Sequence, residues 1–315
     1  MIDTQVVYDT LIVGSGPAGL TAAIYNIRAD LKTLIIAGNQ PGGQLTLTTY
    51  VDNYPGFSTG IGGVKLMMDM QSQVKNLGGE IKQGVVKEIK KTADIFDIYL
   101  ENGEIIKSKS IIIATGAQSK WLGIKGEKEL IGHGVSGCAT CDGIFFKDKV
   151  VAVVGGGNTA CEDGSFLAKF ASKIYMIHRR DKFRAVQIEQ KRILGNNKIE
   201  IWWNSEVTEI IGQEKLEKIK VKNNLTGEEK LVEVDGLFVA IGREPSSIFL
   251  QNLVELEESG YVVTHKNPDF PTMTSTEGIF AAGDCADSVY RQAVAAAGDG
   301  CKAALDVQKW LENGS

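Results

Sequence analysis

Residues 8–19 read YDTLIVGSGPAG, and the helical stretch Leu20–Ala29 follows them. An apolar run with the length of a buried strand precedes three glycines with the spacing Gly14-x-Gly16-x-x-Gly19. In this arrangement the first glycine makes the turn, the second lets a pyrophosphate approach, and the third packs the helix on the strand. The start of the helix offers free N–H groups to phosphates. The stretch therefore predicts a dinucleotide-binding α/β unit, and the alternative is a bare tight turn.

The same order of elements recurs later in the chain. The apolar run Val150–Val154 precedes Gly155-Gly156-Gly157-Asn158-Thr159-Ala160 and a helix to about Phe170. Each copy closes with alternating apolar runs and a buried strand that ends in Ala-x-Gly, at Ile111–Gly116 and at Leu237–Gly242. A repeated architecture with little residue identity indicates two dinucleotide sites. The predicted fold class is α/β, with two Rossmann-like three-layer ββα dinucleotide-binding domains.

The segment after residue 245 is too short to form a third domain. It holds a strand-like run, Tyr261–Thr264, and a helix from about Arg291 to Leu311. We expect this segment to complete the first domain, because both copies of the repeated unit end before it begins.

The second domain is therefore predicted to be inserted into the first. We expect the first domain to comprise residues 1–118 and 248–315, and the inserted domain to comprise residues 119–247. The chain crosses between them near Gly116–Trp121 and Gly242–Ser247. Glycine and proline at these crossings fit a paired hinge.

The composition is that of an ordinary globular protein. The 315 residues include 34 Lys and Arg against 39 Asp and Glu, and the pI near 5.4 argues against a nucleic-acid partner. No apolar stretch reaches the ~18 residues that a membrane span needs. The polar segment Met1–Thr10 lacks the basic-then-apolar pattern of a signal peptide. Five cysteines, an odd number, do not make a secreted disulfide framework, so we expect a cytoplasmic protein with no membrane partner.

The two copies differ in the residues after their second strands. After Thr33–Ile36, Ala37-Gly38-Asn39 stand where an acid usually holds the ribose, so another part of the chain must hold it. After Ile174–Ile177 come His178-Arg179-Arg180-Asp181 and then Arg184. Because arginine suits a 2′-phosphate, the second site is predicted to favour NADPH over NADH. The alternative is a solvated basic loop.

Cys138 and Cys141 form a Cys-x-x-Cys motif between the two dinucleotide signals. Such a pair can close a small disulfide ring, and its thiolates can have lowered pKa values. The motif therefore predicts redox exchange, with an inert thiol pair as the alternative. Asp142 is adjacent and could move a proton to or from a departing thiolate, or it could cap a turn.

The other cysteines, Cys161, Cys285 and Cys301, are isolated, and the three histidines are scattered at positions 133, 178 and 265. A zinc site at the dithiol would need a second ligand pair, so no metal is predicted. The isolated cysteines are interpreted as packed small hydrophobes. Cys285 stands next to Asp284 near a predicted cofactor, which leaves some sensitivity to redox conditions open.

Two nucleotide sites and one dithiol together predict an electron relay. A hydride donor delivers two electrons at once, and a flavin can accept them and pass them to sulfur. The predicted route runs from NADPH to FAD, then to the disulfide, and then to an outside partner.

The chain resembles the bacterial low-molecular-weight thioredoxin reductases, which are class II pyridine nucleotide-disulfide oxidoreductases, over essentially its whole length. The resemblance implies NADPH-dependent reduction of the thioredoxin disulfide by a homodimer. It also implies an inserted domain that rotates between two states, with either the dithiol or NADPH at the flavin. The matching stretches are GSGPAG (14–19), GGQL (42–45), NYPG (53–56), CATCDG (138–143), GGGNTA (155–160), HRRDKFRA (178–185), and Gly283-Asp284 through YRQA (290–293).

The resemblance also assigns roles to particular residues. Cys141 would be the sulfur nearest the flavin and form the adduct with it, Cys138 would attack the thioredoxin disulfide, and Asp142 would donate and accept the proton. The residues implied in NADPH binding are Gly155, Gly156, Gly157, Asn158, Thr159, Ala160, Arg179, Arg180 and Arg184. Those implied in FAD binding are Gly14, Ser15, Gly16, Pro17, Ala18, Gly19, Ala37, Gly42, Gly43, Gln44, Asn53, Thr115, Gly116, Gly283, Asp284, Arg291, Gln292 and Ala293.

One departure and several rival functions accompany this resemblance. Cys161-Glu162-Asp163-Gly164 differs from the usual pattern after the second glycine loop, and Gly164 is expected to cost its helix about 1 kcal/mol relative to alanine. An NADPH–ferredoxin reductase usually lacks the dithiol. A ferredoxin-fed reductase or an oxygen-using dithiol oxidase does not need the arginines. A non-enzymatic nucleotide-binding protein would not turn over.

Overall fold

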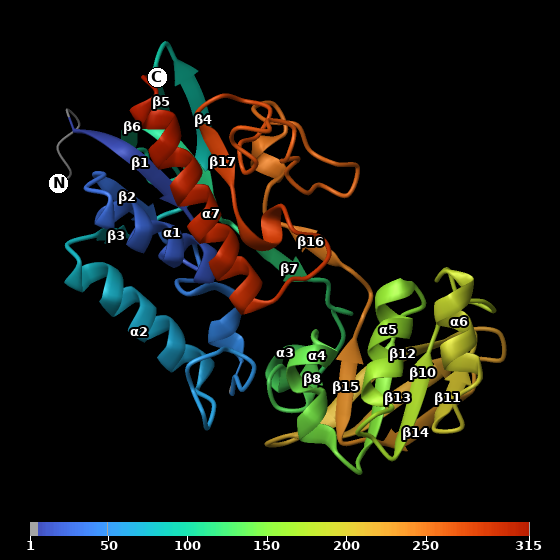
Figure 1. Ribbon diagram of the computed structural model, residues 1–315. Coiled ribbons are helices and arrows are strands. Elements are labelled where there is room, and N and C mark those ends of the chain that lie inside the picture. Colours follow the sequence, from blue (N-terminus) through green and yellow to red (C-terminus); the bar gives the residue numbers. More distant parts are fainter. Residues whose placement is uncertain (1–5, 49, 315) are drawn as a thin grey trace. The chain divides into compact units, whose positions relative to one another are not determined.

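The computed structural model of the chain describes residues 6–48 and 50–314. The chain forms two compact units: unit 1 comprises residues 1–118 and 244–315, and unit 2 comprises residues 119–243 (Figure 1). Of the polar N-terminal segment Met1–Thr10, the first five residues lie outside the described part.

Unit 1 is built on a parallel sheet with the strand order β3-β2-β1-β6, and β17 also pairs with β6. Beyond β6, the sheet continues antiparallel through β5 to β4. The strands are β1 (Val7–Val13), β2 (Thr33–Ile36), β3 (Glu80–Lys82), β4 (Val86–Thr92), β5 (Ile95–Leu100), β6 (Ile105–Ile113) and β17 (Ile279–Ala281).

The central strands of unit 1 are covered on both faces. Ile12 and Ile112 pack with helices α1, α2 and α7, whereas their neighbours Leu11 and Ile111 pack with β4 and β5. Burial on both faces explains the apolar runs Leu11–Val13 in β1 and Leu34–Ile36 in β2, which a sheet with one face in water would not need. Figure 1 shows α1 and α7 side by side, in agreement with their close packing. The helices are α1 (Pro17–Arg28), α2 (Gly63–Asn76) and α7 (Ala293–Glu312), with short 3₁₀ turns η1 (Gly43–Leu47), η3 (Ile248–Leu250) and η4 (Gly283–Cys285).

Unit 2 repeats the plan around a parallel sheet of order β11-β10-β9-β15-β8. Val151 and Val153 pack under helix α5, and Ala152 and Val154 pack against an antiparallel three-stranded sheet of order β12-β13-β14. The strands are β8 (Val135–Ser136), β9 (Val150–Val154), β10 (Lys173–Ile177), β11 (Ile199–Trp202), β12 (Ser205–Gly212), β13 (Leu216–Asn223), β14 (Glu229–Glu233) and β15 (Gly236–Val239). The helices are α3 (Glu127–Leu130), α4 (Ala139–Asp142), α5 (Asn158–Leu167) and α6 (Gln187–Leu194), with the 3₁₀ turn η2 (Gly143–Phe146).

The two segments that connect the units pair with each other. Strands β7 (Ala117–Ser119) and β16 (Arg243–Pro245) form a two-stranded sheet. Around it, the Ser246 N–H donates to the carbonyl of Gly116 at 3.0 Å, and the Lys120 N–H donates to that of Gly242 at 3.0 Å. The predicted crossings therefore lie side by side.

Two expectations for the C-terminal segment need correction. The strand predicted at Tyr261–Thr264 is wrong: within this run only Val262 forms a β-bridge, an isolated one with Leu256, so no ladder of consecutive pairs develops. Helix α7 begins at Ala293 rather than at Arg291. Arg291 has φ +50°, a left-handed conformation that an α-helix does not accept.

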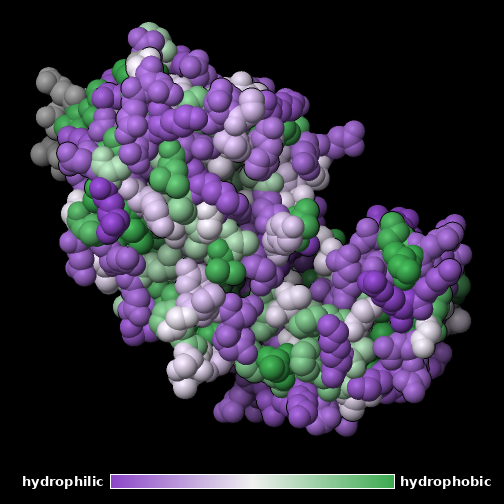
Figure 2. All heavy atoms as spheres, viewed as in Figure 1, coloured by the Kyte–Doolittle hydropathy of each residue, from purple (hydrophilic) through white to green (hydrophobic). Residues whose placement is uncertain are grey.

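Hydrophilic residues cover most of the face shown in Figure 2, with apolar residues scattered among them. Within residues 6–48 and 50–314, no helix combines the length and the apolar character that crossing a membrane requires.

Candidate active site

The first glycine loop lies between β1 and α1, and its backbone depends on glycine. Gly14 has φ +114°, and a Cβ there would lie 2.1 Å from the carbonyl oxygen of Ala114 at the end of β6. A Cβ at Gly19 would lie 2.0 Å from the carbonyl oxygen of Gly14. Gly16 differs, because a Cβ there would meet nothing within 4 Å. The loop thus leaves open space at the start of α1, where the helix presents its unbonded N–H groups.

The second glycine loop reproduces this geometry at the start of α5. Gly155 has φ +153°, and a Cβ there would lie 2.4 Å from the carbonyl oxygen of Ala240. Gly157 again opens on empty space. Gly16 and Gly157 cap their helices with nearly the same backbone, at ψ −174° and −175°. Both loops therefore fit a group with a pyrophosphate, because the space beside Gly16 and Gly157 is open.

Several predicted FAD residues gather around the first loop. The Ser15 hydroxyl donates to the carbonyl of Ala37 at 2.9 Å and accepts the Gly42 N–H at 3.0 Å. This double contact ties the end of β2 and the turn before η1 to the glycine loop. A Cβ on Gly43 would lie 3.4 Å from the Cα of Gly16, so the two backbones approach closely.

The remaining predicted FAD residues come from other parts of unit 1. A Cβ on Gly283 would lie 2.9 Å from that of Ala18, which places the start of η4 beside α1. Thr115 follows β6, and its backbone nitrogen would be 3.1 Å from a Cβ on Gly14. The Asn53 amide donates to the Gln292 side chain at 3.4 Å. The others lie next to these in the chain: Pro17 opens α1, Gln44 lies in η1, Gly116 follows Thr115, Asp284 follows Gly283, and Arg291 and Ala293 flank Gln292.

In unit 2 the arginine segment folds against the second glycine loop. The Arg184 N–H donates to the carbonyl of Gly156 at 2.7 Å, and the Val186 N–H donates to the Asn158 side chain at 2.9 Å. The His178 ring lies over Gly156, where a Cβ would come within 2.2 Å of the ring. These contacts bring the backbone of Arg184 to the start of α5, and Arg179 and Arg180 directly follow His178 in the chain.

His178 supports this arrangement from inside. Its side chain is only 5% exposed, packs against the rings of Phe183 and Trp203, and lies with Nε2 3.0 Å from the carbonyl of Lys182. Burial lowers the pKa of His178 below its ordinary value, and repulsion from the nearby arginines lowers it further, although the bond to Lys182 acts in the opposite direction. His178 is therefore a neutral structural element of the loop.

We expect the neutral state of His178 to make unit 2 less stable in mild acid. Because its pKa in the folded protein lies below the ordinary value of 6.5, the unfolded chain takes up the proton first as the pH falls. The contribution of His178 to the free energy of unfolding should therefore be largest above about pH 6.5. Below that pH the free energy of unfolding should decline, by up to ~1 kcal/mol per pH unit. Urea unfolding between pH 7.5 and 5.5 measures this slope.

His178→Asn should flatten the slope, and the matched variant His133→Asn, at an exposed histidine of the same unit, should retain it. An unchanged slope in His178→Asn would refute this account.

The dithiol lies between β8 and η2. Cys138 and Cys141 are joined as a disulfide, with their Cα atoms 5.4 Å apart, and both residues are half-buried. Helix α4 carries Cys141 and Asp142, and Cys138 caps its start. The Thr140 hydroxyl lies 3.4 Å from the Cys138 sulfur. A half-buried disulfide in a short turn is open to exchange with another thiol.

The other cysteines are placed differently. Cys161 in α5 and Cys285 in η4 are fully buried, and burial raises the pKa of each thiol to about 11. Both thiols are therefore protonated at neutral pH and are poor nucleophiles. Cys301 in α7 is half-buried and has no disulfide partner.

Sequence reasoning missed the group that fixes Asp142. The Ser136 hydroxyl donates to Asp142 Oδ2 at 2.6 Å and accepts the Cys138 N–H at 3.0 Å. A serine two residues before a cysteine carries no signal of its own, because serine is common in loops. Sequence reasoning also missed the packing role of His178. This histidine lies in a charged motif that was interpreted from its arginines alone.

Comparisons with known proteins agree with this geometry. The family described as "Pyridine nucleotide-disulphide oxidoreductase" matches residues 8–300. Thioredoxin reductase of Rickettsia felis is 48% identical over 304 residues, which cover 96% of this chain and 97% of that protein. Thioredoxin reductase of Mycolicibacterium smegmatis is 44% identical and covers 99% of both chains.

Solved structures give the same result. Thioredoxin reductase from Streptococcus pyogenes superposes with a TM-score of 0.91 at 38% identity, over 98% of this chain and 99% of that one. The enzyme from Giardia duodenalis also reaches 0.91, at 41% identity, over 98% and 100% of the two chains. The chain therefore belongs to the pyridine nucleotide-disulphide oxidoreductases, in the group of thioredoxin reductases. The predicted family and α/β class are confirmed, and with them the use of a flavin and a pyridine nucleotide.

Proposed function

We propose that the protein reduces the disulfide of thioredoxin with electrons from NADPH, by way of FAD and the Cys138–Cys141 disulfide. The observation that carries the proposal is the half-buried disulfide beside Asp142, in a unit that also holds a glycine loop flanked by three arginines. A flavin reductase without a thiol substrate would need no such disulfide.

We assign FAD to unit 1 and NADPH to unit 2. Two features support the first assignment: the open space at Gly16, and the Ser15 contacts that draw Ala37 and Gly42 to the loop in place of an acid after β2. The assignment of NADPH to unit 2 rests on Arg179, Arg180 and Arg184, because positively charged guanidinium groups can bind a 2′-phosphate with two hydrogen bonds each. The predicted FAD domain, residues 1–118 and 248–315, and the predicted NADPH domain, residues 119–247, correspond to units 1 and 2 except at residues 244–247, which belong to unit 1.

The nicotinamide and the flavin supply hydride and electron transfer, and the chain supplies the thiols and the proton. Reduction breaks the Cys138–Cys141 bond with two electrons and gives two thiolates; Asp142 protonates one of them and takes the proton back before that sulfur attacks. The Cys138 thiolate then attacks one thioredoxin sulfur, the other thioredoxin sulfur leaves as a thiolate, and a mixed disulfide results. Attack of the Cys141 thiolate on Cys138 releases the second thioredoxin sulfur and restores the disulfide.

This cycle needs the dithiol to meet the flavin at one stage and thioredoxin at another. We place the pivot at the paired strands β7 and β16, because the two connections between the units lie side by side there. The odd number of cysteines and the free buried thiols fit a reducing compartment, and we propose the cytoplasm.

Anaerobic titration of the yellow protein with NADPH tests the proposal. We expect about two hydride equivalents per chain, one for the flavin and one for the disulfide, and far poorer reduction by NADH. Uptake of one equivalent would mean that the disulfide is not coupled to the flavin. A flavin that does not bleach would indicate a ferredoxin-fed or non-catalytic protein.

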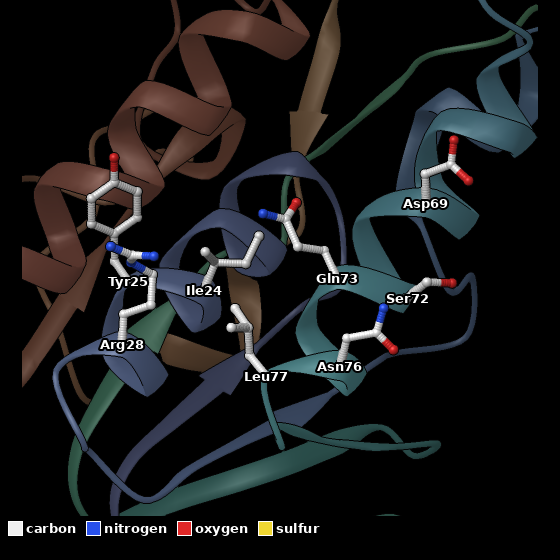
Figure 3. Close-up of a pocket in the computed structure, with 8 residues that line it drawn as sticks. All are labelled: Ile24, Tyr25, Arg28, Asp69, Ser72, Gln73, Asn76 and Leu77. Atoms are coloured by element: carbon white, nitrogen blue, oxygen red, sulfur yellow. The ribbon is translucent and has the colours of Figure 1, made fainter.

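We also propose that the protein is a homodimer through the outer face of α1 and α2. Large apolar side chains are exposed there, with Met68 58% exposed and Tyr25 41% exposed. Figure 3 shows a pocket between the two helices, with Arg28 on α1 and Asp69 on α2. A face that carries both charges can pair with a second copy of itself across a two-fold axis, each arginine meeting the other copy's aspartate.

Met68→Asp should convert the dimer to a monomer, because each of the two copies then places one new negative charge in the apolar interface. Light scattering after gel filtration measures the mass. The matched variant Leu225→Asp, at an apolar side chain 78% exposed in unit 2, should remain dimeric. If both variants were monomeric, or if both remained dimeric, the outer face of α1 and α2 would not be the dimer interface.

A further inference from the structure

The Ser136 hydroxyl has more hydrogen-bonding options than it can use at once. Ser136 ends β8 and is 7% exposed. Its Oγ accepts the Cys138 N–H at 3.0 Å and lies 2.6 Å from Asp142 Oδ2. A second possible acceptor, the carbonyl oxygen of Cys138, lies 3.4 Å away. The single hydroxyl hydrogen can therefore be donated either to the Asp142 carboxylate or to the Cys138 carbonyl, but not to both at once.

The protonation state of Asp142 determines which acceptor the Ser136 hydroxyl uses. A serine hydroxyl has one hydrogen and two lone pairs, and the Cys138 N–H occupies one lone pair. When Asp142 is ionised, the hydroxyl donates to Oδ2. When Asp142 carries a proton, the carboxylic acid can donate to the remaining lone pair, and the hydroxyl hydrogen turns to the Cys138 carbonyl. Both protonation states are hydrogen-bonded without any displacement of the backbone.

We propose that Ser136 is a positioning residue that holds the Asp142 carboxyl beside the dithiol in both of its protonation states. The inference rests on the proposed function, in which Asp142 exchanges the proton. When two-electron reduction breaks the Cys138–Cys141 bond, two thiolates form and one takes the proton of Asp142. The carboxylate that remains is then met by the Ser136 hydroxyl, which turns its hydrogen back to Oδ2.

A second hydroxyl lies near the disulfide, because Thr140 Oγ1 is 3.4 Å from the Cys138 sulfur. The Arg243 guanidinium donates to the carbonyl of Gly137 at 3.4 Å, within the Ser136–Cys138 turn. The Ser136 hydroxyl contacts both the Cys138 N–H of this turn and Asp142 Oδ2.

The test is Ser136→Ala in the full-length holoenzyme. The kcat for thioredoxin reduction should fall about tenfold, as expected when one hydrogen bond to a charged group is lost. The limb of the pH–rate profile that reports Asp142 should move to higher pH, because the carboxylate has lost a donor. Ser205→Ala is the matched control: it removes another buried serine hydroxyl of unit 2, bonded to the Trp203 carbonyl, and should leave both quantities unchanged.

Further variants separate positioning from folding. Ser136→Thr keeps the hydroxyl and should keep the wild-type pH profile, and far-UV circular dichroism checks that each variant is folded. In an Asp142→Asn background, Ser136→Ala should have little further effect, because the two residues act as a unit. The half-life of the reduced dithiol toward iodoacetamide, followed against pH, supplies a readout without turnover.

The outcomes distinguish this inference from the proposed function. If wild-type protein reduces ferricyanide with NADPH but not thioredoxin, the proposed function fails. If wild-type protein reduces thioredoxin and Asp142→Asn is slow, but Ser136→Ala has the wild-type rate and pH profile, the role of Ser136 is refuted. A slow Ser136→Ala with an unshifted pH profile would also overturn it, since the defect would then be structural.

Discussion

Cys141→Ser should lower thioredoxin reduction by at least about 10³-fold, the scale of loss when a covalent nucleophile is removed, while NADPH still bleaches the flavin. The replacement keeps the size of the side chain but prevents the disulfide with Cys138 from forming. Electrons then reach the flavin and have no sulfur to enter. Steady-state reduction of thioredoxin, with reduction of ferricyanide measured beside it, separates the two half-reactions.

The matched control is Cys301→Ser, which changes a half-buried thiol outside the disulfide and should leave thioredoxin reduction intact. The anaerobic titration should also change: Cys141→Ser should take up about one hydride equivalent where the wild type takes up about two. Thioredoxin reduction that survives in Cys141→Ser would show that the electrons leave by a route other than this disulfide.

The second large effect concerns the choice of nucleotide. Arg179→Ala combined with Arg184→Ala should raise the KM for NADPH by about 10²- to 10⁴-fold, since each lost charged hydrogen bond costs ~1.5–3 kcal/mol. The KM for NADH, which has no 2′-phosphate, should barely change. The Arg184 backbone N–H contact with Gly156 survives the substitution, so the loop should keep its shape. Steady-state kinetics with both nucleotides measure the ratio.

A control for net charge is Lys218→Ala combined with Lys230→Ala, in the β13–β14 hairpin. These lysines pair with Glu233 and Glu228 on the surface, where ion pairs contribute little. The control removes the same two positive charges from unit 2 and should leave the preference for NADPH unchanged. An equal loss of affinity for both nucleotides in the arginine variant would indicate that the loop had collapsed.

Much of this fold could be predicted because its decisive signals are local. Gly19 must lack a Cβ because of its contact with Gly14 inside one strand–turn–helix unit, and the positive φ of Gly14 is likewise a local property that recurs at Gly155. The apolar runs of β2 and β9 result from burial on both faces. In such cases the residues that determine the structure are also neighbours in the sequence.

The features that escaped prediction depend on residues far apart in the chain. Gly164 is expected from its sequence to weaken α5, but a Cβ there would lie 2.8 Å from the Met176 sulfur and 3.0 Å from Ile193. It is therefore the small residue that lets α5 pack on β10 and α6. The false strand at Tyr261–Thr264 has the same origin, because only the tertiary structure shows that this run has a single isolated bridge, between Val262 and Leu256, and no partner strand.

The side-by-side strands β7 and β16 have a consequence for the ancestry of the chain. The point where unit 2 begins and the point where it ends are within hydrogen-bond distance, at Lys120 with Gly242 and at Gly116 with Ser246. A domain whose two ends meet can be added to a host gene at one position without separating the elements on either side. The elements of unit 1 on either side of the insert therefore remain neighbours: β17 pairs with β6 although unit 2 lies between them in the chain.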